Sequence, residues 1–170
     1  MACNQTLSGI TTNCGPNKGG IRKVVIRNKS DIDSITLTDG KVTAITKGAS
    51  APAAATFEFR KGSSSMSSTL TVSEENGTAY ISTEVAMRFA KMETAKRTSM
   101  MSLIYAETVA LVEDQNGKWW LLGYDNPVTV SAGNGNTGTA MGDANEYGVT
   151  LHDESEAYPY EVDATVAEAF

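Results

Sequence analysis

The chain has 170 residues, of which 41% are hydrophobic and 20% are charged. This length and balance are typical of one globular domain and exclude a disordered chain. No apolar run approaches the roughly 18 residues of a membrane-spanning helix, and the polar Met1–Gln5 opening lacks the pattern of a secretory signal. One histidine and two cysteines leave little material for metal or nucleophilic chemistry, so we expect no cofactor.

Charge is distributed unevenly along the chain. Residues 119–170 carry nine acids and no base, whereas residues 1–118 carry 14 bases and 11 acids. An acidic C-terminal third disfavours binding to phosphates and suits a surface that must repel DNA, although solubility alone explains it equally well. The basic excess of the first part could also face the acidic part of a neighbouring copy, head to tail.

Three turn dipeptides divide the β-like part of the chain. After a first strand at Ile21–Arg27, Asp39-Gly40 predicts a hairpin between Ile32–Thr38 and Lys41–Thr46. Asn76-Gly77 predicts a second hairpin, between Met66–Ser73 and Ala79–Phe89. In its second strand Ile81, Thr83, Val85, Met87 and Phe89 alternate with polar residues, which indicates a half-buried strand.

Helical spacing of apolar residues over Lys91–Tyr105 predicts one helix of three to four turns. Glu93 precedes Lys96 and Arg97 by three and four residues, an arrangement that supports a helix. The segments Lys47–Thr56 and Ser131–Asn145 are rich in small and polar residues and are expected to be loops. Short strands are expected at Pro127–Ser131 and Gly148–Leu151.

The third turn, Asn116-Gly117, predicts a hairpin between Thr108–Gln115 and Lys118–Tyr124. A two-residue loop would set Asp114 opposite Trp119 and Val112 opposite Leu121. Trp120 and Leu122 would then share the other face with Leu111. Large apolar groups on both faces indicate a hairpin that is covered on both sides. The residues expected to anchor the core are Val112, Trp119, Trp120 and Leu121.

These elements predict a mainly β fold, an antiparallel β-sandwich or partial barrel with one packed α-helix. We expect the sandwich domain over residues 21–158, with the helix near 91–105. An N-terminal arm over 1–20 and a C-terminal arm over 159–170 would fold onto neighbouring copies.

Several chemical motifs in the sequence are incomplete. Gly133–Gly138 matches a dinucleotide-binding pattern, but the residues after it, Thr139–Asp143, are a poor helix start, and there is no strand–helix–strand context. His152 and Asp153 have no serine nucleophile on a sharp turn, and the pairs Asp31/Asp33 and Glu154/Glu156 are typical of surface charge. Cys3 and Cys14 are expected to be free thiols, although the sequence does not exclude their pairing. No catalytic, cofactor-binding or metal-binding residue is therefore predicted.

The order of elements also resembles a known protein family. The segments that carry the resemblance are Met1–Leu7, Gly19–Ile21, Met92–Arg97, Asp114–Gly123 and Gly138–Leu151. They resemble small structural virion proteins of tailed phages that infect gut Bacteroides-type bacteria, including the crAss-like group. Within phages, the element order resembles that of tail-tube proteins. This resemblance implies a ring, often hexameric, whose inner sheets line a channel, and it implies no chemical reaction.

Together these observations lead us to expect a non-enzymatic ring- or tube-forming subunit of a phage tail or head–tail neck. Its expected partners are other copies, other virion proteins and genomic DNA that passes without specific binding; no membrane is expected. Such a protein would be assembled in the host cytoplasm and reside in the virion. The residues expected to line the channel are Asp143, Glu146, Asp153, Glu154 and Glu156.

Two alternatives remain open from the sequence. An auxiliary or decoration protein of the capsid would share the β-rich, acidic composition but bind shell proteins. A small enzyme or a carbohydrate-binding module would use surface aromatic residues, for which Tyr147, Tyr158 and Tyr160 are candidates.

Overall fold

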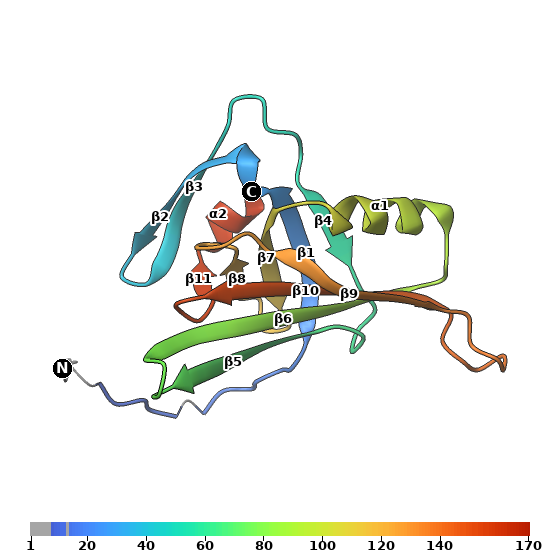
Figure 1. The fold of residues 1–170 in the computed structure, drawn as a ribbon, viewed down its shortest axis with the longest axis horizontal. Helices are drawn as coiled ribbons and strands as arrows, with labels where there is room; N and C mark the ends of the chain where they lie inside the picture. The colour runs from blue at the N-terminus through green and yellow to red at the C-terminus, as the bar shows by residue number, and fades with distance from the viewer. Residues whose placement is uncertain (1–7, 13) are drawn as a thin grey trace.

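Two β-sheets face each other in the computed structural model, which describes residues 8–12 and 14–170 (Figure 1). In the larger sheet the spatial order is β2 (Ile32–Thr38), β3 (Lys41–Lys47), β11 (Tyr160–Val162), β8 (Trp119–Leu122), β7 (Thr108–Asp114), β1 (Ile21–Asn28) and β4 (Ala55–Glu58). The smaller sheet has the order β5 (Ser65–Ser73), β6 (Thr78–Ala90), β10 (Glu146–Ser155) and β9 (Thr129–Asn136). Among these pairs only β3–β11 is parallel. The expected mainly β, sandwich-like fold with a packed helix is confirmed.

The first two predicted hairpins are confirmed, but their turns differ. In the β2–β3 turn Asp39 and Gly40 have φ values of 52° and 76°, as a type I′ turn requires. In the second hairpin Ser73 pairs with Thr78, so the connection has four residues rather than two. The alternation predicted for β6 is confirmed, since Ile81, Val85 and Met87 are buried.

The third hairpin forms with a register that differs by one residue from the prediction. Trp119 lies opposite Glu113, and Leu121 lies opposite Leu111. The cause is a loop of three residues, 115–117, instead of two. The N–H of Asp114 closes this loop by donating to the carbonyl of Lys118 at 2.9 Å, and Gly117 within it has a φ of 79°. A one-residue slip exchanges the two faces of a strand, so the predicted pairing of Val112 with Leu121 is wrong.

The hairpin is covered on both sides, as predicted. One cluster, between the two sheets, contains Val112 with partly buried Trp120 against it. The other cluster, on the outer side of the larger sheet, contains Trp119 and Leu121, together with Leu111 from β7. Val112, Trp119 and Leu121 are buried, which confirms their place in the core, and the indole N–H of Trp120 donates to Asp114 at 3.2 Å.

Helix α1 spans Thr94–Ile104 and is shorter than predicted. Lys91 precedes it with a φ of 67°, and the N–H groups of Lys91 and Met92 donate to the main-chain and side-chain oxygens of Asn145. This turn ends β6 and redirects the chain before the helix begins. Only Leu103 of the helix is buried, so α1 covers one side of the sandwich without entering it.

The expected loop at Ser131–Asn145 and the expected arm at 159–170 both require correction. Residues 131–136 belong to β9, and residues 132–136 pair with β10, because main-chain hydrogen bonds to a neighbouring strand do not depend on side-chain size. The segment 159–170 is not an arm on a neighbour. It forms β11, between β3 and β8, and helix α2 (Ala164–Glu168), and it buries Phe170 against the larger sheet. The domain therefore extends beyond residue 158.

The N-terminal segment has no helix or strand in residues 8–12 and 14–20. It is exposed, and in the view of Figure 1 it passes below β5 and continues beyond the β5–β6 turn. Hydrogen bonds between Asn116 and the pair Asn17 and Lys18 attach its C-terminal end to the β7–β8 turn. Its binding to a neighbouring copy stays a prediction. Cys14 is exposed. Cys3 lies outside the described residues, so the structure does not test whether the two cysteines pair.

Candidate functional site: the open face and free edges of the smaller sheet

The smaller sheet has one face on the core and one face in solvent. Alternation along β6 and β10 sends Val85, Met87, Val149 and Leu151 inward. The opposite, outer face carries mostly small or hydroxyl side chains. It is formed by Ser65, Ser67, Thr69, Thr71 and Ser73 of β5, Thr78, Tyr80, Ser82, Glu84, Ala86, Arg88 and Ala90 of β6, Glu146, Gly148, Thr150, His152 and Glu154 of β10, and Thr129, Ala132, Asn134 and Asn136 of β9.

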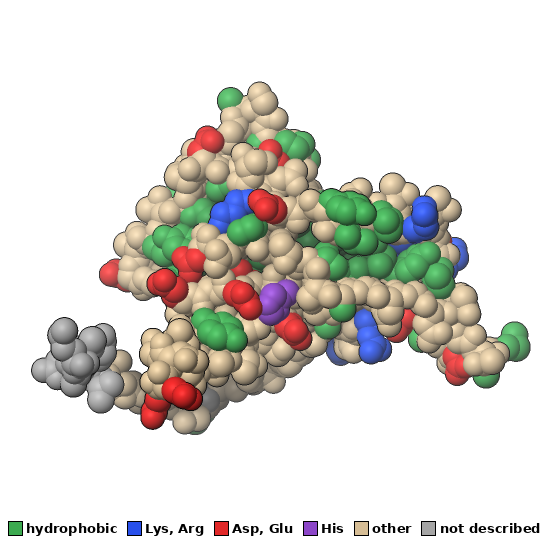
Figure 2. Space-filling view, in the orientation of Figure 1, with side chains coloured by type: hydrophobic (Ala, Val, Ile, Leu, Met, Phe, Trp, Pro, Cys, Tyr) green, Lys and Arg blue, Asp and Glu red, His purple; other side chains and the backbone are tan. Residues whose placement is uncertain are grey.

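This outer face is weakly acidic. Its charged residues are Glu84, Arg88, Glu146 and Glu154, which give a net charge of −2 with His152 neutral. The Arg88 guanidinium lies 3.6 Å from Glu146, and Nε2 of His152 lies 3.3 Å from Glu154. In Figure 2 acidic side chains gather near the end of β10 that approaches β11, and few basic ones accompany them. The net charge of this face gives phosphate groups little overall attraction.

The five residues predicted to line a channel do not form one group. Glu146 and Glu154 lie on the outer face, at opposite ends of β10. Asp143 lies in the β9–β10 connection, where it accepts hydrogen bonds from the N–H groups of Thr139 and Ala140, which lower the pKa of its carboxyl. Glu156 follows the end of β10, and its N–H donates to Asp125.

Asp153 is the exception, and its prediction as an exposed channel residue is wrong. Its side chain points inward, is 2% exposed and accepts a hydrogen bond of 3.1 Å from the N–H of Gly123. Burial raises the pKa of Asp153, and the hydrogen bonds from Gly123 and Ser155 act in the opposite direction. Because Gly123 follows β8 and Asp153 lies in β10, this bond ties the two sheets together. Alternation with Val149 and Leu151 was the signal that places it inside.

Both edges of the smaller sheet are free in the described part of the chain: β5 pairs only with β6, and β9 only with β10. Neither β5 nor β9 contains a charged residue or a proline. The edges of the larger sheet differ, since β2 contains Asp33 and β4 contains Glu58. Charges, prolines and short length are what usually protect an edge from pairing with another chain, so the two edges of the smaller sheet are open to such pairing.

The strand count determines how two copies could join at these edges. Four antiparallel strands make β5 and β9 run in opposite directions. The β5 edge of one copy and the β9 edge of the next can therefore continue the same antiparallel pattern. Because the two edges are different surfaces, the contact is head to tail, and it closes into a ring when the rotation between copies permits.

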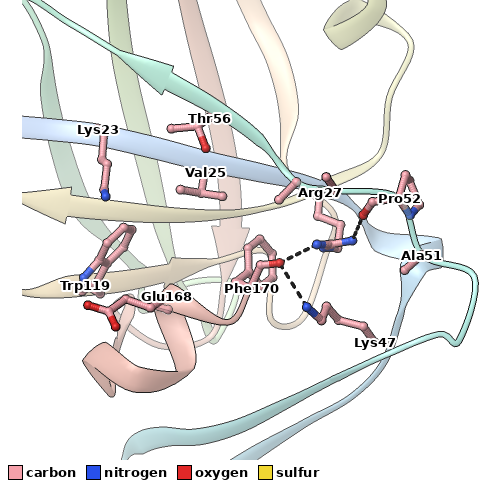
Figure 3. A pocket seen from close by; sticks show the side chains of 13 residues that line it. Lys23, Val25, Arg27, Lys47, Ala51, Pro52, Thr56, Trp119, Glu168 and Phe170 are labelled. Carbon is pink, nitrogen blue, oxygen red and sulfur yellow. Dashed lines mark hydrogen bonds between the residues drawn. The ribbon is translucent and has the colours of Figure 1, made fainter.

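Two clefts contain several cationic side chains, most of which have acidic or main-chain partners. The first, of about 490 Å³, lies between β1, α2 and the segment before β4. Figure 3 shows Arg27 and Lys47 directed at the main-chain oxygen of Phe170, and Arg27 also donates to the carbonyl of Pro52. Lys23 lies 5.0 Å from the centre of the Trp119 ring. The contacts of Arg27 and Lys47 with Phe170 hold the segment after α2 against the larger sheet.

The second cleft, of about 540 Å³, is lined by Arg60, Arg88 and Lys91 together with Asp143 and Glu146. Arg88 pairs with Glu146, and Lys91 pairs with Glu93 at 2.7 Å. In the described ranges, 8–12 and 14–170, no three His, Cys, Asp or Glu side chains are grouped so that they could hold a metal ion.

The three tyrosines proposed for sugar binding are not on one face. Tyr147 points inward and lies over Gly135 of β9. Tyr160 packs edge-on against Tyr124, with ring centres 5.3 Å apart, and only Tyr158 is largely exposed. The geometry does not assemble them into an aromatic platform.

Comparisons with known proteins return no relatives. No family model matches the chain, and neither curated proteins nor solved structures give a match. Neither helix in the part of the chain that the structure describes is long and apolar enough to cross a membrane.

Proposed function

We propose that this protein is a structural subunit that assembles into a ring or tube of a tailed-phage virion, in the tail or the head–tail neck. The observation that carries the proposal is an open, polar and weakly acidic sheet face between two uncharged, antiparallel edges that no described strand covers. The sequence resemblance to tail-tube-like virion proteins supplies the phage context.

Closure removes the free edges that an isolated copy leaves open. When β5 of each copy pairs with β9 of the next, every strand of the smaller sheet gains neighbours on both sides. Six copies with four strands each would form a barrel of about 24 strands, and at about 4.8 Å spacing and 40° tilt its backbone diameter is roughly 48 Å. That leaves room for a nucleic-acid duplex after the side chains of both walls are subtracted.

The outer face of the smaller sheet would then line the channel. Glu84, Glu146 and Glu154 would face the passing DNA, with Arg88 partly neutralised by Glu146. A weakly negative wall covered in hydroxyl groups keeps phosphates from adhering, because binding to DNA is dominated by contacts from Lys and Arg. The predicted set of channel residues is thereby reduced to Glu146 and Glu154, with Glu84 added.

The test is the assembly state of the purified full-length protein over increasing concentration, measured by light scattering and negative-stain imaging. We expect rings or tubes of about six-fold symmetry. Thr71→Lys puts a charge on the β5 edge and should prevent assembly. Thr36→Lys makes the same change on an exposed position of β2 and should leave assembly intact.

A strictly monomeric wild-type protein at high concentration would overturn this proposal. A capsid decoration protein would then be the favoured function. Its copy number relative to the major capsid protein would distinguish it from a tail or neck subunit. Equal loss of assembly in both lysine variants would also contradict the proposal, since it would locate the contact away from the β5 edge.

A further inference from the structure

An apolar groove runs between α1 and β9, beside one free edge of the smaller sheet. Met100, Met101 and Ile104 line it from the helix, and Val130 and Gly133 line it from β9; its volume is about 390 Å³. Met101 is 43% exposed and Ile104 is 48% exposed. Figure 2 shows hydrophobic side chains gathered along α1 above β9.

Glycine keeps the floor of this groove bare. Gly133 lies on the inner side of β9, opposite Val149 of β10. A Cβ at Gly133 would meet its nearest atom, the carbonyl oxygen of Gly148, at an ordinary 3.5 Å. The isolated chain therefore has room for a side chain here, unlike at Gly135, where a Cβ would lie 3.0 Å from the Tyr147 ring.

The opposite edge of the same sheet carries two apolar side chains that the described part of the chain leaves largely exposed. Leu70 and Val72 of β5 pair with Ile81 and Ala79 of β6 and share the inner side of the sheet with Ile81. Ile81 is 4% exposed, whereas Leu70 is 50% exposed and Val72 is 61% exposed. The hairpin extends past the core, so residues 8–12 and 14–170 cover these two inward-facing side chains only in part.

We propose that Leu70 and Val72 of one copy fill the α1–β9 groove of the next copy, with Leu70 opposite the partner subunit's Gly133. This inference rests on the proposed ring, whose interface it specifies. Pairing of the β5 and β9 edges keeps inner faces together, because alternation allows inner side chains to meet only inner side chains. The large side chain of one strand then lies beside the bare position of the other.

The charges of the two edges are compatible with β5 of a second copy as the occupant of the groove. The nine residues of β5 and the eight of β9 carry no charge, so no like-charge pair opposes the contact. Among the residues that the structure describes, Arg97 is the one charged residue that lines the groove, and it comes from the helix rather than from either edge. A second copy supplies the uncharged, β-prone strand that such a groove and edge accept.

Cysteine cross-linking tests the register. With Cys3 and Cys14 changed to Ser, Thr71→Cys and Ala132→Cys lie on the outer face and become neighbours across the proposed interface. Within one chain β6 and β10 lie between these two positions, so the distance between them is about 14 Å or more, beyond the reach of a disulfide. Mild oxidation should yield covalent oligomers up to a closed ring. Thr71→Cys with Ala44→Cys, an exposed position on β3, should yield none.

A second variant fills the groove. Gly133→Val should leave the monomer folded but raise the concentration needed for assembly by at least about tenfold, the effect of overpacking an interface by one isopropyl group. Circular dichroism and thermal unfolding at low concentration verify the fold. Two results would overturn this inference and leave the proposed function standing, provided that the wild type forms rings. One is the absence of a cross-link between Thr71→Cys and Ala132→Cys, and the other is normal assembly of Gly133→Val. Absence of any wild-type assembly would overturn both.

Discussion

Asp153 offers a sharp test of how the two sheets are held together, because one atom of its carboxyl carries the contact. Asp153→Ala removes the acceptor of the buried Gly123 N–H and should destabilise the monomer by about 1–3 kcal/mol. For a domain of this size that lowers the midpoint of thermal unfolding by roughly 2–12 °C. Asp153→Asn keeps an oxygen acceptor in the same place and removes the charge that burial penalises. It should be at least as stable as the wild type at pH 7.

The dependence on pH follows from the raised pKa of Asp153. Below the ordinary pKa of 3.8 the carboxyl is protonated in both the folded and the unfolded chain and contributes nothing. As pH rises from there, the unfolded chain releases its proton first, so the wild type loses stability relative to Asp153→Asn until the folded pKa is passed. Urea unfolding followed by tryptophan fluorescence between pH 3 and 8 measures this. The reasoning is refuted if Asp153→Asn is as unstable as Asp153→Ala at pH 7, or if its advantage does not grow with pH.

Three further changes probe the fold at low protein concentration. Gly123→Ala should cost about 1–3 kcal/mol in a urea titration, because φ is 89° and the new Cβ would lie 3.0 Å from the carbonyl of Thr108; Gly142→Ala, with open space around it, should change little. Leu121→Ala should cost about 2–5 kcal/mol by the same measurement, since the side chain is 1% exposed in the cluster beneath α2. Removal of residues 159–170 takes away β11 from between β3 and β8 and should abolish cooperative unfolding in calorimetry, whereas a true arm could be removed without effect.

Short-range features of the molecule were readable from the sequence. The Asp39-Gly40 turn is an example, since positive φ at two successive residues is a local preference of these side chains. Alternation in β6 is another, because period two directly reports which face is buried. The outer face of the smaller sheet, including Glu84, Glu146 and Glu154, follows from the same alternation once the strand pairing is known.

Features that depend on a distant neighbour were not readable. The β7–β8 register changed with one additional loop residue, which the composition of the turn does not specify. The glycine-rich β9 became a strand because β10 supplied its hydrogen bonds, and the segment after residue 158 became β11 because an open position existed between β3 and β8. Both are main-chain pairings, to which side-chain patterns contribute little.

The candidate interface has the same origin. Leu70, Val72 and Gly133 are unremarkable along the chain, where they read as parts of ordinary strands or loops. Only the tertiary structure places the first two on an inner face beyond the end of the core and the third at the floor of a groove beside α1. The sequence by itself determined the fold class, the hairpins and the lack of charge on β5 and β9, because these are local properties. Long-range strand pairing decided which edges stay free and what lies beside them. The reason is that a strand is an edge only because the other strands of the sheet pair elsewhere.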